Sequence, residues 1–444
     1  TALMKTWDQA RKDGVNVPKV SFILPFGPSD ASYNMIKSLY EDVYKPNKYS
    51  DLWFYWKGKP VLMAYDNIPT DNAADKAMKN FFTFRPGQPD YVNGPSDNSQ
   101  WGWLEIYPQN MYGLNEEVTV GVAQNTCASN YYHASAFNRS GTLGRSYMGK
   151  TKSWDTRENS YLYGANFAEQ WERALELDPQ LVFVTGWNEY IAGKWQDPWN
   201  GFPFSFVDQY NWNCSRDIEP NAGWGDKGDV YYLQLVDNVR KFKGMDAPEK
   251  ASAPKTVKIG KADGWDDVAP YYRHYKGNTM HRDHRGCYSA YYVNNTGRND
   301  IVGAKVARDD ENLYFYVETA EELTPSTDRN WMMLFIDTDR DKATGWNGYD
   351  IIVNRVSPEG KKVIVEKNVG NRWEWETVAE CKFAVNVDKL EFAIPREVLG
   401  IEGENVDIEF KWNDNMQDNG NIMDFYVNGD TAPGGRFNFV YTTK

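Results

Sequence analysis

The chain has 444 residues, of which 41% are hydrophobic, 25% charged and 15% aromatic, so it is not a disordered chain and has room for two or three domains. Its net charge of −13 disfavours nucleic acid, whose phosphates need an excess of Lys and Arg, and an anionic membrane surface. No apolar run approaches the roughly 20 residues of a membrane span, and the four cysteines lie too far apart for a common zinc knuckle or a dense disulfide framework.

The first residues, 2–13, have the pattern of the latter part of an amphipathic helix. Neither a signal peptide nor an initiator Met precedes them. We therefore expect that targeting information has been removed or never existed.

Residues 1–245 alternate between strand-like and helix-like patterns, which predicts a parallel α/β domain. Several of the strand-like runs are apolar throughout, as expected for strands buried on both faces. The predicted strands are 20–26, 60–66, 81–85, 101–107, 118–124 and 181–189. Helical periodicity covers 32–43, 163–177 and 229–242.

These six strands fall short of the eight that a (β/α)₈ barrel needs. Because the chain opens inside a helix, we predict a TIM-like barrel whose N-terminal strands are missing from this chain. The alternative is an open doubly wound sheet. No Gly-rich phosphate loop follows the first strand, which favours the barrel.

The residue pattern changes after residue 245. Residues 246–257 contain Ala, Pro, Lys and Ser without apolar periodicity and are predicted to be a linker. From 258 to 444, short alternating segments between turn residues predict an all-β sandwich of about eight strands. These segments are 301–306, 313–319, 331–337, 349–353, 362–367, 374–381, 389–394 and 407–412.

The strand at 181–189 ends in the first candidate for catalysis, Glu189. The carboxyl ends of barrel strands open into the active-site mouth. Glu189 follows Asn188 and stands between the aromatic residues Trp187 and Tyr190, so partial desolvation would favour its neutral form, as a general acid requires. We predict Trp187, Asn188 and Tyr190 as substrate contacts. The alternative is that Glu189 caps the following loop.

The segment WGWLEIYPQ supplies the second candidate, Glu105. If it is a strand, period-two alternation places Trp101, Trp103, Glu105 and Tyr107 on one face. Aromatic rings beside a carboxylate suit a sugar, and we predict Trp103 as a stacking residue. The alternative is an inward-facing Glu105 bound to an arginine such as Arg85.

Three further residues complete the predicted site of the first domain. Asp66 ends the strand-like segment PVLMAYD and is the third candidate carboxylate, although a turn-initiating Asp fits as well. Arg85 ends FFTFR and is predicted to bind substrate or to hold a carboxylate in place. His133 lies in a long aromatic-rich stretch, 125–160, which we expect to be an ordered loop roofing a cleft, and is predicted as a weak ligand contact.

The second domain contains a candidate metal site. Asp337, Asp339 and Asp341 alternate in FIDTDRDKATGWNGYD, with Asp350 beyond, and oxygen ligands on alternate residues are typical of loops that hold Ca²⁺. The full EF-hand pattern fails. The alternative is an Asp-rich turn whose side chains cap its own backbone.

The 18 Trp and 29 Tyr residues favour a saccharide as partner, because sugar rings stack on flat aromatic faces and their hydroxyls need polar groups at the rim. In the sandwich, two facing tryptophans could clamp a sugar or could simply belong to the core. The tryptophans concerned are Trp331, Trp346, Trp373, Trp375 and Trp412.

The motifs PVLMAYD, WGWLEIYPQ and WNEY resemble the barrel glycosidases of glycoside hydrolase families 71 and 99, loosely over residues 1–245. SRDIEP, at 215–220, is similar to a segment that follows the last strand in related bacterial glycan-degrading proteins. The resemblance to family 99 implies that Glu189 matches the catalytic base. Ala192 stands where that family has its acid, so the resemblance implies that the acid is absent or supplied by Glu105, Asp66 or the missing strands.

Residues 258–444 resemble family 9-like carbohydrate-binding modules, on the segments DGWDDV, DDENLYFYVE and FIDTDRDKATGW. This resemblance implies sugar binding and, often, structural calcium. We expect the predicted glycoside hydrolysis to require no cofactor.

Together these observations predict a bacterial glycoside hydrolase that is secreted, periplasmic or on the cell surface and acts as a monomer on an oligo- or polysaccharide. Two carboxylates would carry the acid and base roles. The alternative is a non-catalytic glycan-binding protein built on a barrel that has lost one carboxylate.

Overall fold

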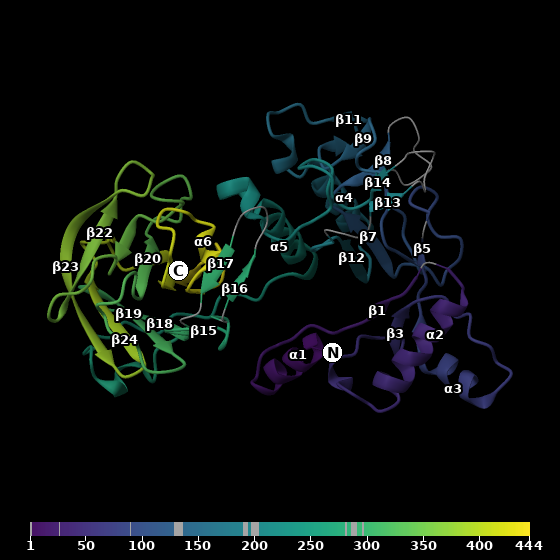
Figure 1. Cartoon of the computed structure of the whole chain (residues 1–444). Helices are drawn as coiled ribbons and strands as arrows, with labels where there is room; N and C mark the ends of the chain where they lie inside the picture. Colours follow the sequence, from purple (N-terminus) through teal and green to yellow (C-terminus); the bar gives the residue numbers. More distant parts are fainter. Residues whose placement is uncertain are drawn as a thin grey trace. The chain divides into compact units, whose positions relative to one another are not determined.

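The computed structural model describes the chain except for residues 1, 26, 89, 128–135, 190–193, 197–203, 280–281, 286–290 and 295–296. The predicted contacts His133 and Tyr190 therefore lie outside the described residues. The chain forms two compact units (Figure 1). Unit 1 comprises Thr1–Asn221 and Asp229–Met245, and unit 2 comprises Ala222–Gly228 and Asp246–Lys444.

Unit 1 contains the helices that the sequence predicted and one more, α3. Its α-helices are α1 (Ala2–Lys12), α2 (Asp30–Leu39), α3 (Ala73–Phe81), α4 (Ala165–Leu177) and α5 (Val230–Lys243). Short helical turns are η1 (Tyr40–Tyr44), η2 (Ser50–Leu52) and η3 (Ser160–Leu162). No described helix is long and apolar enough to cross a membrane.

The strands of unit 1 are short. They are β1 (Phe22–Ile23), β2 (Tyr55–Trp56), β3 (Lys59–Met63), β4 (Thr83–Phe84), β5 (Gly87–Gln88), β6 (Trp101–Gly102), β7 (Glu117–Gly121), β8 (Gln124–Cys127), β9 (Thr142–Gly144), β10 (Tyr147–Met148), β11 (Ser153–Trp154), β12 (Leu181–Thr185), β13 (Lys194–Gln196) and β14 (Phe204–Phe206).

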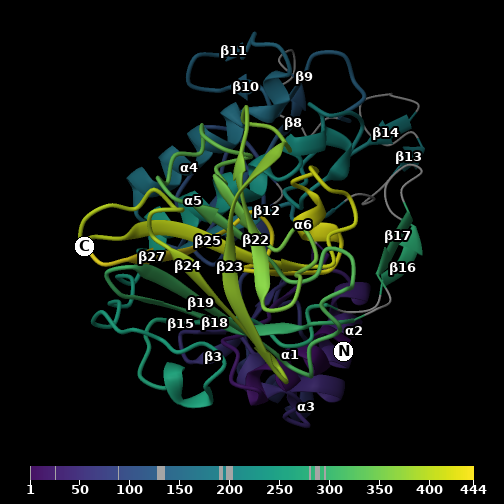
Figure 2. The same cartoon turned by 90° about the vertical axis from the view of Figure 1, so that its left-hand side faces the viewer.

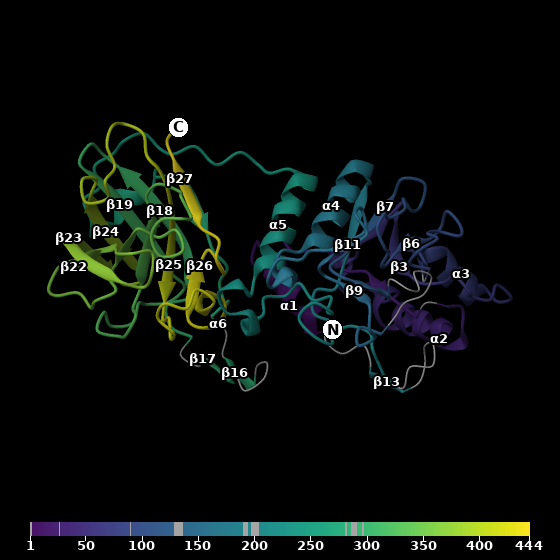
Figure 3. The same ribbon diagram turned by 90° about the horizontal axis from the view of Figure 1, so that it is seen from above.

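Parallel pairing links the strands that carry the predicted apolar runs. β1 and β4 pair in parallel with β3, β5 pairs with β6, and β7 pairs with β12. Helix α4 packs on β7, and α4 lies beside α5 (Figure 3), where the rings of Phe167 and Tyr231 are 6.0 Å apart. Parallel strands with covering helices agree with the α/β pattern, and closure into an eight-stranded barrel stays a prediction.

Two predicted strands of unit 1 differ from the observed elements. Phe81 ends helix α3, which begins after Asn72, whose Oδ1 accepts a hydrogen bond from the Asp75 N–H at 2.8 Å. The run at 101–107 is a strand only over Trp101–Gly102, because the N–H of Gly102 donates to the Glu117 carboxylate (2.6 Å) instead of continuing a backbone ladder.

Unit 2 is built from antiparallel strands, and all eight predicted segments are confirmed as strands. They correspond to β18 (Ile301–Arg308), β19 (Asn312–Thr319), β20 (Met333–Asp337), β21 (Ile351–Val353), β22 (Lys362–Asn368), β23 (Trp375–Asn386), β24 (Lys389–Pro395) and β25 (Asp407–Asp414). The additional strands are β15 (Tyr271–Arg273), β16 (Arg282–Arg285), β17 (Tyr291–Asn294), β26 (Asp430–Ala432) and β27 (Phe439–Thr442). The described helices of this unit are the short η4 (Ala222–Lys227), η5 (Ala262–Trp265) and α6 (Asp424–Val427).

One sheet runs through β15-β18-β19-β24-β23-β22-β21-β20-β25-β26, with β27 added at β25 (Figure 2). Alternate residues of its strands, such as Leu313, Phe315 and Val317, enter one buried apolar core with residues of β20, β22 and β25. The sheet therefore folds over on itself around this core. A two-layered sandwich in the strict sense stays a prediction.

The end of the predicted linker packs on unit 2. The N–H of Lys255 donates to the carbonyl of Arg308 (2.7 Å), and Val257 is buried beside Trp265. Burial of an apolar side chain fixes this end of the segment in place.

Candidate functional site

The segment SRDIEP, residues 215–220, is hydrogen-bonded to the residues that directly follow β12. The N–H of Ile218 donates to the carbonyls of Gly186 (3.0 Å) and Trp187 (3.1 Å), and the N–H of Glu219 donates to Trp187 (2.9 Å). Gly186 has φ +95°, and a Cβ there would lie 2.3 Å from the carbonyl oxygen of Arg216. Only glycine permits this close approach.

Arg216 joins Glu189 to a carboxylate that sequence reasoning missed, Asp208. Its Nη2 donates to Glu189 Oε2 at 3.1 Å and also to Asp208 Oδ1. The guanidinium is 5.0 Å from the ring centre of Trp103 and 6.0 Å from that of Phe137. The structure thus brings Glu189 and Trp103 to the same arginine.

Glu189 and Asp208 form a contacting carboxyl pair. Partial burial raises the pKa of Glu189 despite the attraction of Arg216, and the neighbouring Asp208 carboxyl, which hydrogen-bonds to it, raises this pKa further. Two carboxyls in contact cannot both ionise freely, so the pair is suited to hold one proton between its oxygens. The Glu189 side chain keeps 38% of its surface exposed and can meet a ligand.

Asp217, the next residue after Arg216, is the second carboxyl that sequence reasoning missed. It is 7% exposed, and neither of its carboxyl oxygens has a hydrogen-bond partner within the part of the chain that the structure describes. Burial raises the pKa of Asp217 to about 7, although Arg145 and Arg216 both lower it. This carboxyl can therefore give or take a proton near neutral pH.

Arg145 holds the backbone on either side of Arg216. It donates to Ser215 Oγ from Nε (3.1 Å) and Nη2 (2.8 Å), and its Nη2 also donates to the carbonyl of Asp217 (2.7 Å). Its guanidinium lies 4.3 Å from the ring centre of Tyr231. The position of Asp217 is thus set by a buried arginine, in a segment that the sequence marked only by its resemblance.

The aromatic side of this site is formed by Trp103 and Tyr91. Their ring centroids are 6.0 Å apart at an angle of 37°. Burial raises the pKa of Tyr91, and so do the charges of Glu189 and Asp208, whereas Arg216 lowers it. Tyr91 lies in a segment without strand or helix periodicity, so no sequence pattern pointed to it.

Glu105 is buried in another set of contacts. Its carboxylate accepts hydrogen bonds from the backbone N–H (2.7 Å) and the side-chain amide (2.6 Å) of Asn110. Burial raises its pKa to about 7, against those hydrogen bonds. Among the described residues no hydrogen bond or ion pair links Glu105 with Glu189.

The alternative for Glu105 expected a pair with Arg85, but Arg85 binds a different carboxylate. It forms two hydrogen bonds with Glu116, from Nε to Oε2 (2.8 Å) and from Nη2 to Oε1 (2.9 Å), where both side chains are buried. Arg85 thus holds a carboxylate, but one that sequence reasoning did not consider. Asp66 is exposed and pairs with Lys79 at 3.2 Å.

The aromatic residue next to Glu189 is accessible. Trp187 is 43% exposed and packs edge-on against Tyr232, with ring centroids 5.6 Å apart. Asn188 is also exposed. Both exposed residues directly precede Glu189 in the chain.

A separate cavity of about 450 Å³ lies in unit 2 and is lined by tryptophan, asparagine and charged side chains. We call it the Trp373 cleft. Its lining is Asp226, Lys342, Ala343, Gly345, Trp346, Asn347, Asn371, Arg372, Trp373, Gly420, Asn421 and Ile422.

The two tryptophans of this cleft do not face each other as a clamp. The rings of Trp346 and Trp373 are 4.5 Å apart at 77°, an edge-to-face arrangement. Trp346 is buried on Phe335, whereas Trp373 is only partly buried. Trp373 is therefore the ring that can offer a surface to a ligand.

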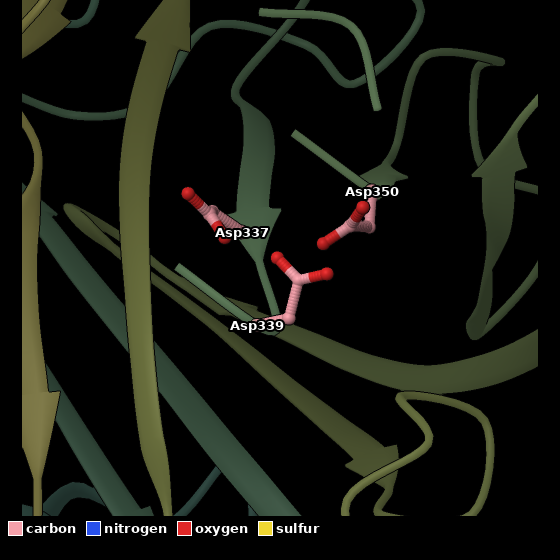
Figure 4. A group of neighbouring side chains, drawn as sticks. All are labelled: Asp337, Asp339 and Asp350. Atoms are coloured by element: carbon pink, nitrogen blue, oxygen red, sulfur yellow. The ribbon is translucent and has the colours of Figure 1, made fainter. Parts of the chain in front are cut away.

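Two of the three residues predicted to hold calcium lie together with a further carboxylate. Asp337, Asp339 and Asp350 lie close enough to hold one ion, with carboxylate oxygens within 4.8 Å of one another (Figure 4). Asp341 is not in this group, and its carboxylate accepts the N–H of Ala343 (2.9 Å) within the turn.

A lysine already neutralises part of this acidic group. Lys342 Nζ lies 2.7 Å from Asp337 Oδ2 and also donates to Glu409. Burial raises the pKa of Asp337 against the attraction of Lys342. Structural calcium at this loop stays a proposal.

Comparisons with known proteins found little. No protein-family model and no curated protein matches the chain, so the resemblance to glycoside hydrolase families 71 and 99 finds no support there. Two solved structures of a family 9 carbohydrate-binding module from Caldicellulosiruptor kristjanssonii are similar to parts of it. The complex with glucose shows 16% identity and a TM-score of 0.20, over 38% of this chain and 78% of that one. The complex with cellotriose shows 19% identity and a TM-score of 0.15, over 25% of this chain and 57% of that one. Similarities this small carry no argument about function.

Proposed function

We propose that the chain is a glycan-binding protein and that the Trp373 cleft of unit 2 receives the saccharide. The observation that carries this proposal is the lining itself, in which a partly exposed Trp373 stands beside Asn347, Asn371 and Asn421. An indole face takes the C–H face of a sugar ring, and amide groups both donate to and accept from hydroxyls.

The shape of the cleft supports a small saccharide unit. Its volume lies within the range of about 300–1,000 Å³ that is usual for small-molecule sites. Backbone turns shape its rim: Gly345 has φ +62°, and a Cβ there would lie 2.2 Å from the carbonyl oxygen of Tyr349. The ring of Trp346 packs against that of Trp373 in an edge-to-face contact that supports its position.

Affinity gel electrophoresis of the full chain in gels that contain β-glucan, mannan or xylan tests this function. We expect at least one polysaccharide to retard the parent protein and Trp373→Ala to weaken the retardation at least tenfold. Trp154→Ala removes an exposed tryptophan from unit 1 and should change nothing. Equal retardation of the parent and Trp373→Ala, or retardation by no polysaccharide, would contradict the proposal.

Glycoside hydrolysis in unit 1 is the second candidate function. It is favoured by one observation: carboxyls with raised pKa, on Glu189 and Asp217, flank the buried Arg216 at the end of β12 beside Trp103. Hydrolysis of a glycosidic bond needs one protonated and one ionised carboxyl. In this function Glu189 meets the substrate, and the protein acts where polymeric glycans occur, outside the cell or in the periplasm.

A further inference from the structure

Asp217 is a buried carboxyl of unit 1 that is not engaged by hydrogen bonds to the surrounding residues that the structure describes. It is nine-tenths buried, and both its oxygens are without a hydrogen-bond partner among the described residues. A buried polar group without a partner destabilises the fold, so such groups are retained where they serve a purpose. The fold meets this cost although two arginines, Arg145 and Arg216, lie close enough to attract the carboxyl.

The carboxyl pair cannot supply both roles of an acid and base by itself. Glu189 and Asp208 share the same nitrogen of Arg216, so their oxygens meet at one point. In glycoside hydrolysis the two carboxyls stand about 5 Å or more apart, on opposite sides of the bond that breaks. A separate third carboxyl is needed.

Asp217 makes no hydrogen bond to that pair, but its segment is bound to the end of β12. It forms no ion pair or hydrogen bond with Arg216, and its neighbour Ile218 donates to the carbonyls of Gly186 and Trp187 at the end of β12. Glu189 follows Trp187 by two residues. These hydrogen bonds hold the segment of Asp217 against the end of β12, from which Glu189 follows.

We propose that Asp217 is the proton donor of the candidate hydrolytic site and that the Glu189–Asp208 pair is its base. The proposal rests on hydrolysis as the second candidate function. It assigns the acid role to a carboxyl that is not hydrogen-bonded to the Glu189–Asp208 pair.

The proposed step moves protons between these groups without any other reactant than water. The proton of Asp217 passes to the glycosidic oxygen as the bond between that oxygen and the anomeric carbon breaks. The oxygen of water bonds to the anomeric carbon, and the carboxyl pair takes the proton that this water loses. Exchange with solvent then returns a proton to Asp217 and removes one from the pair.

A comparison of leaving groups tests the role of Asp217 in the full chain. The dinitrophenolate group of a dinitrophenyl glycoside leaves without being protonated. The phenolate group of a phenyl glycoside is more basic and needs a proton from an acid as it leaves. With a panel of both, made from several monosaccharides and disaccharides, we expect Asp217→Asn to lower kcat/KM at least 100-fold on the phenyl glycoside that the parent cleaves. On the matching dinitrophenyl glycoside the loss should stay below threefold. In the parent, kcat/KM on phenyl glycosides should fall at alkaline pH as Asp217 loses its proton, and this fall should be absent in Asp217→Asn.

Three further variants make the result decisive. Glu189→Gln should lose activity on both leaving groups, and Asp97→Asn, a carboxyl that accepts from Ser99, should lose none. Asn is isosteric with a protonated Asp, so Asp217→Asn should fold. Asp217→Glu keeps a carboxyl and should retain part of the rate on phenyl glycosides that Asp217→Asn loses. Equal losses of Asp217→Asn on both leaving groups, or no loss, would overturn the proposal alone. A parent that cleaves neither panel would remove the hydrolytic function, and the proton donor with it.

Discussion

Two buried arginines of unit 1 satisfy their charges in different ways. Arg85 meets Glu116 in a two-bond pair that also receives Trp101 Nε1 at 2.8 Å. Arg216 places a single nitrogen between two carboxyls and leaves Nε and Nη1 without a partner among the described residues. The first arrangement is complete and structural. The second keeps donors that a ligand or water can use.

The Arg85–Glu116 pair predicts a stability that depends on pH. Burial tends to raise the pKa of Glu116, but hydrogen bonds from Arg85, Lys57 and Trp101 outweigh it and lower the pKa to about 2, from 4.5. A carboxyl with a lowered pKa stabilises the fold fully above its unfolded value and loses this contribution as the pH falls through the folded value. We expect Glu116→Gln to lower the free energy of unfolding by about 3 kcal/mol at pH 7.

Urea unfolding followed by tryptophan fluorescence measures this effect. The difference between the parent and Glu116→Gln should shrink as the pH falls from 4.5 towards 2. Glu172→Gln changes an exposed carboxyl paired with Lys150 and should cost less than about 0.5 kcal/mol. A difference that stays constant over this pH range would mean that the pair does not stabilise the fold through the charge of Glu116.

At the scale of elements, periodicity predicted the strands that pair through backbone hydrogen bonds. It missed the features that depend on hydrogen bonds from side chains. β19 is recognisable because Leu313, Phe315 and Val317 alternate into a core. β6 ends at Gly102, because the Glu117 carboxylate takes the Gly102 N–H, and no local pattern reveals a partner 15 residues away. The same reason hides Asp208 and Asp217, whose roles depend on contacts with the end of β12.

Glu189 was accessible to sequence reasoning for the opposite reason. It lies shortly after β12, a strand with a strong apolar signal, so its place near a strand end could be predicted. The arginine that binds it could not, since Arg216 is 27 residues further along the chain. A pair so far apart in the chain has no characteristic sequence spacing by which it could be recognised.

The loop between β20 and β21 allows a sharp test of calcium. If Ca²⁺ binds Asp337, Asp339 and Asp350, calcium must displace Lys342 from Asp337, and it will then raise the melting midpoint of the parent over that in EDTA. Asp350→Asn should abolish this rise. Asp341→Asn changes a carboxylate outside the group and should keep it. An equal midpoint of the parent in calcium and EDTA would remove the calcium proposal.

At the scale of the whole molecule, the two proposed sites belong to different compact units. Changes at sites without shared partners add, so the effects of Trp373→Ala and Asp217→Asn on a phenyl glycoside should be independent. Such a small substrate occupies unit 1 only. We therefore expect Trp373→Ala to change its rate by less than twofold, and the loss in Asp217→Asn to be the same in both backgrounds.

An insoluble polysaccharide should behave differently, because a bound unit 2 keeps unit 1 at a high local concentration of substrate. We expect Trp373→Ala to lower the release of reducing ends from such a polymer about tenfold at low protein concentration, and the loss to vanish as the concentration rises. Trp154→Ala serves again as the control. If Trp373→Ala lowered the rates on the polymer and the phenyl glycoside by the same factor, the tryptophan would act through the stability of the chain, and binding in the cleft would not be what couples the two units.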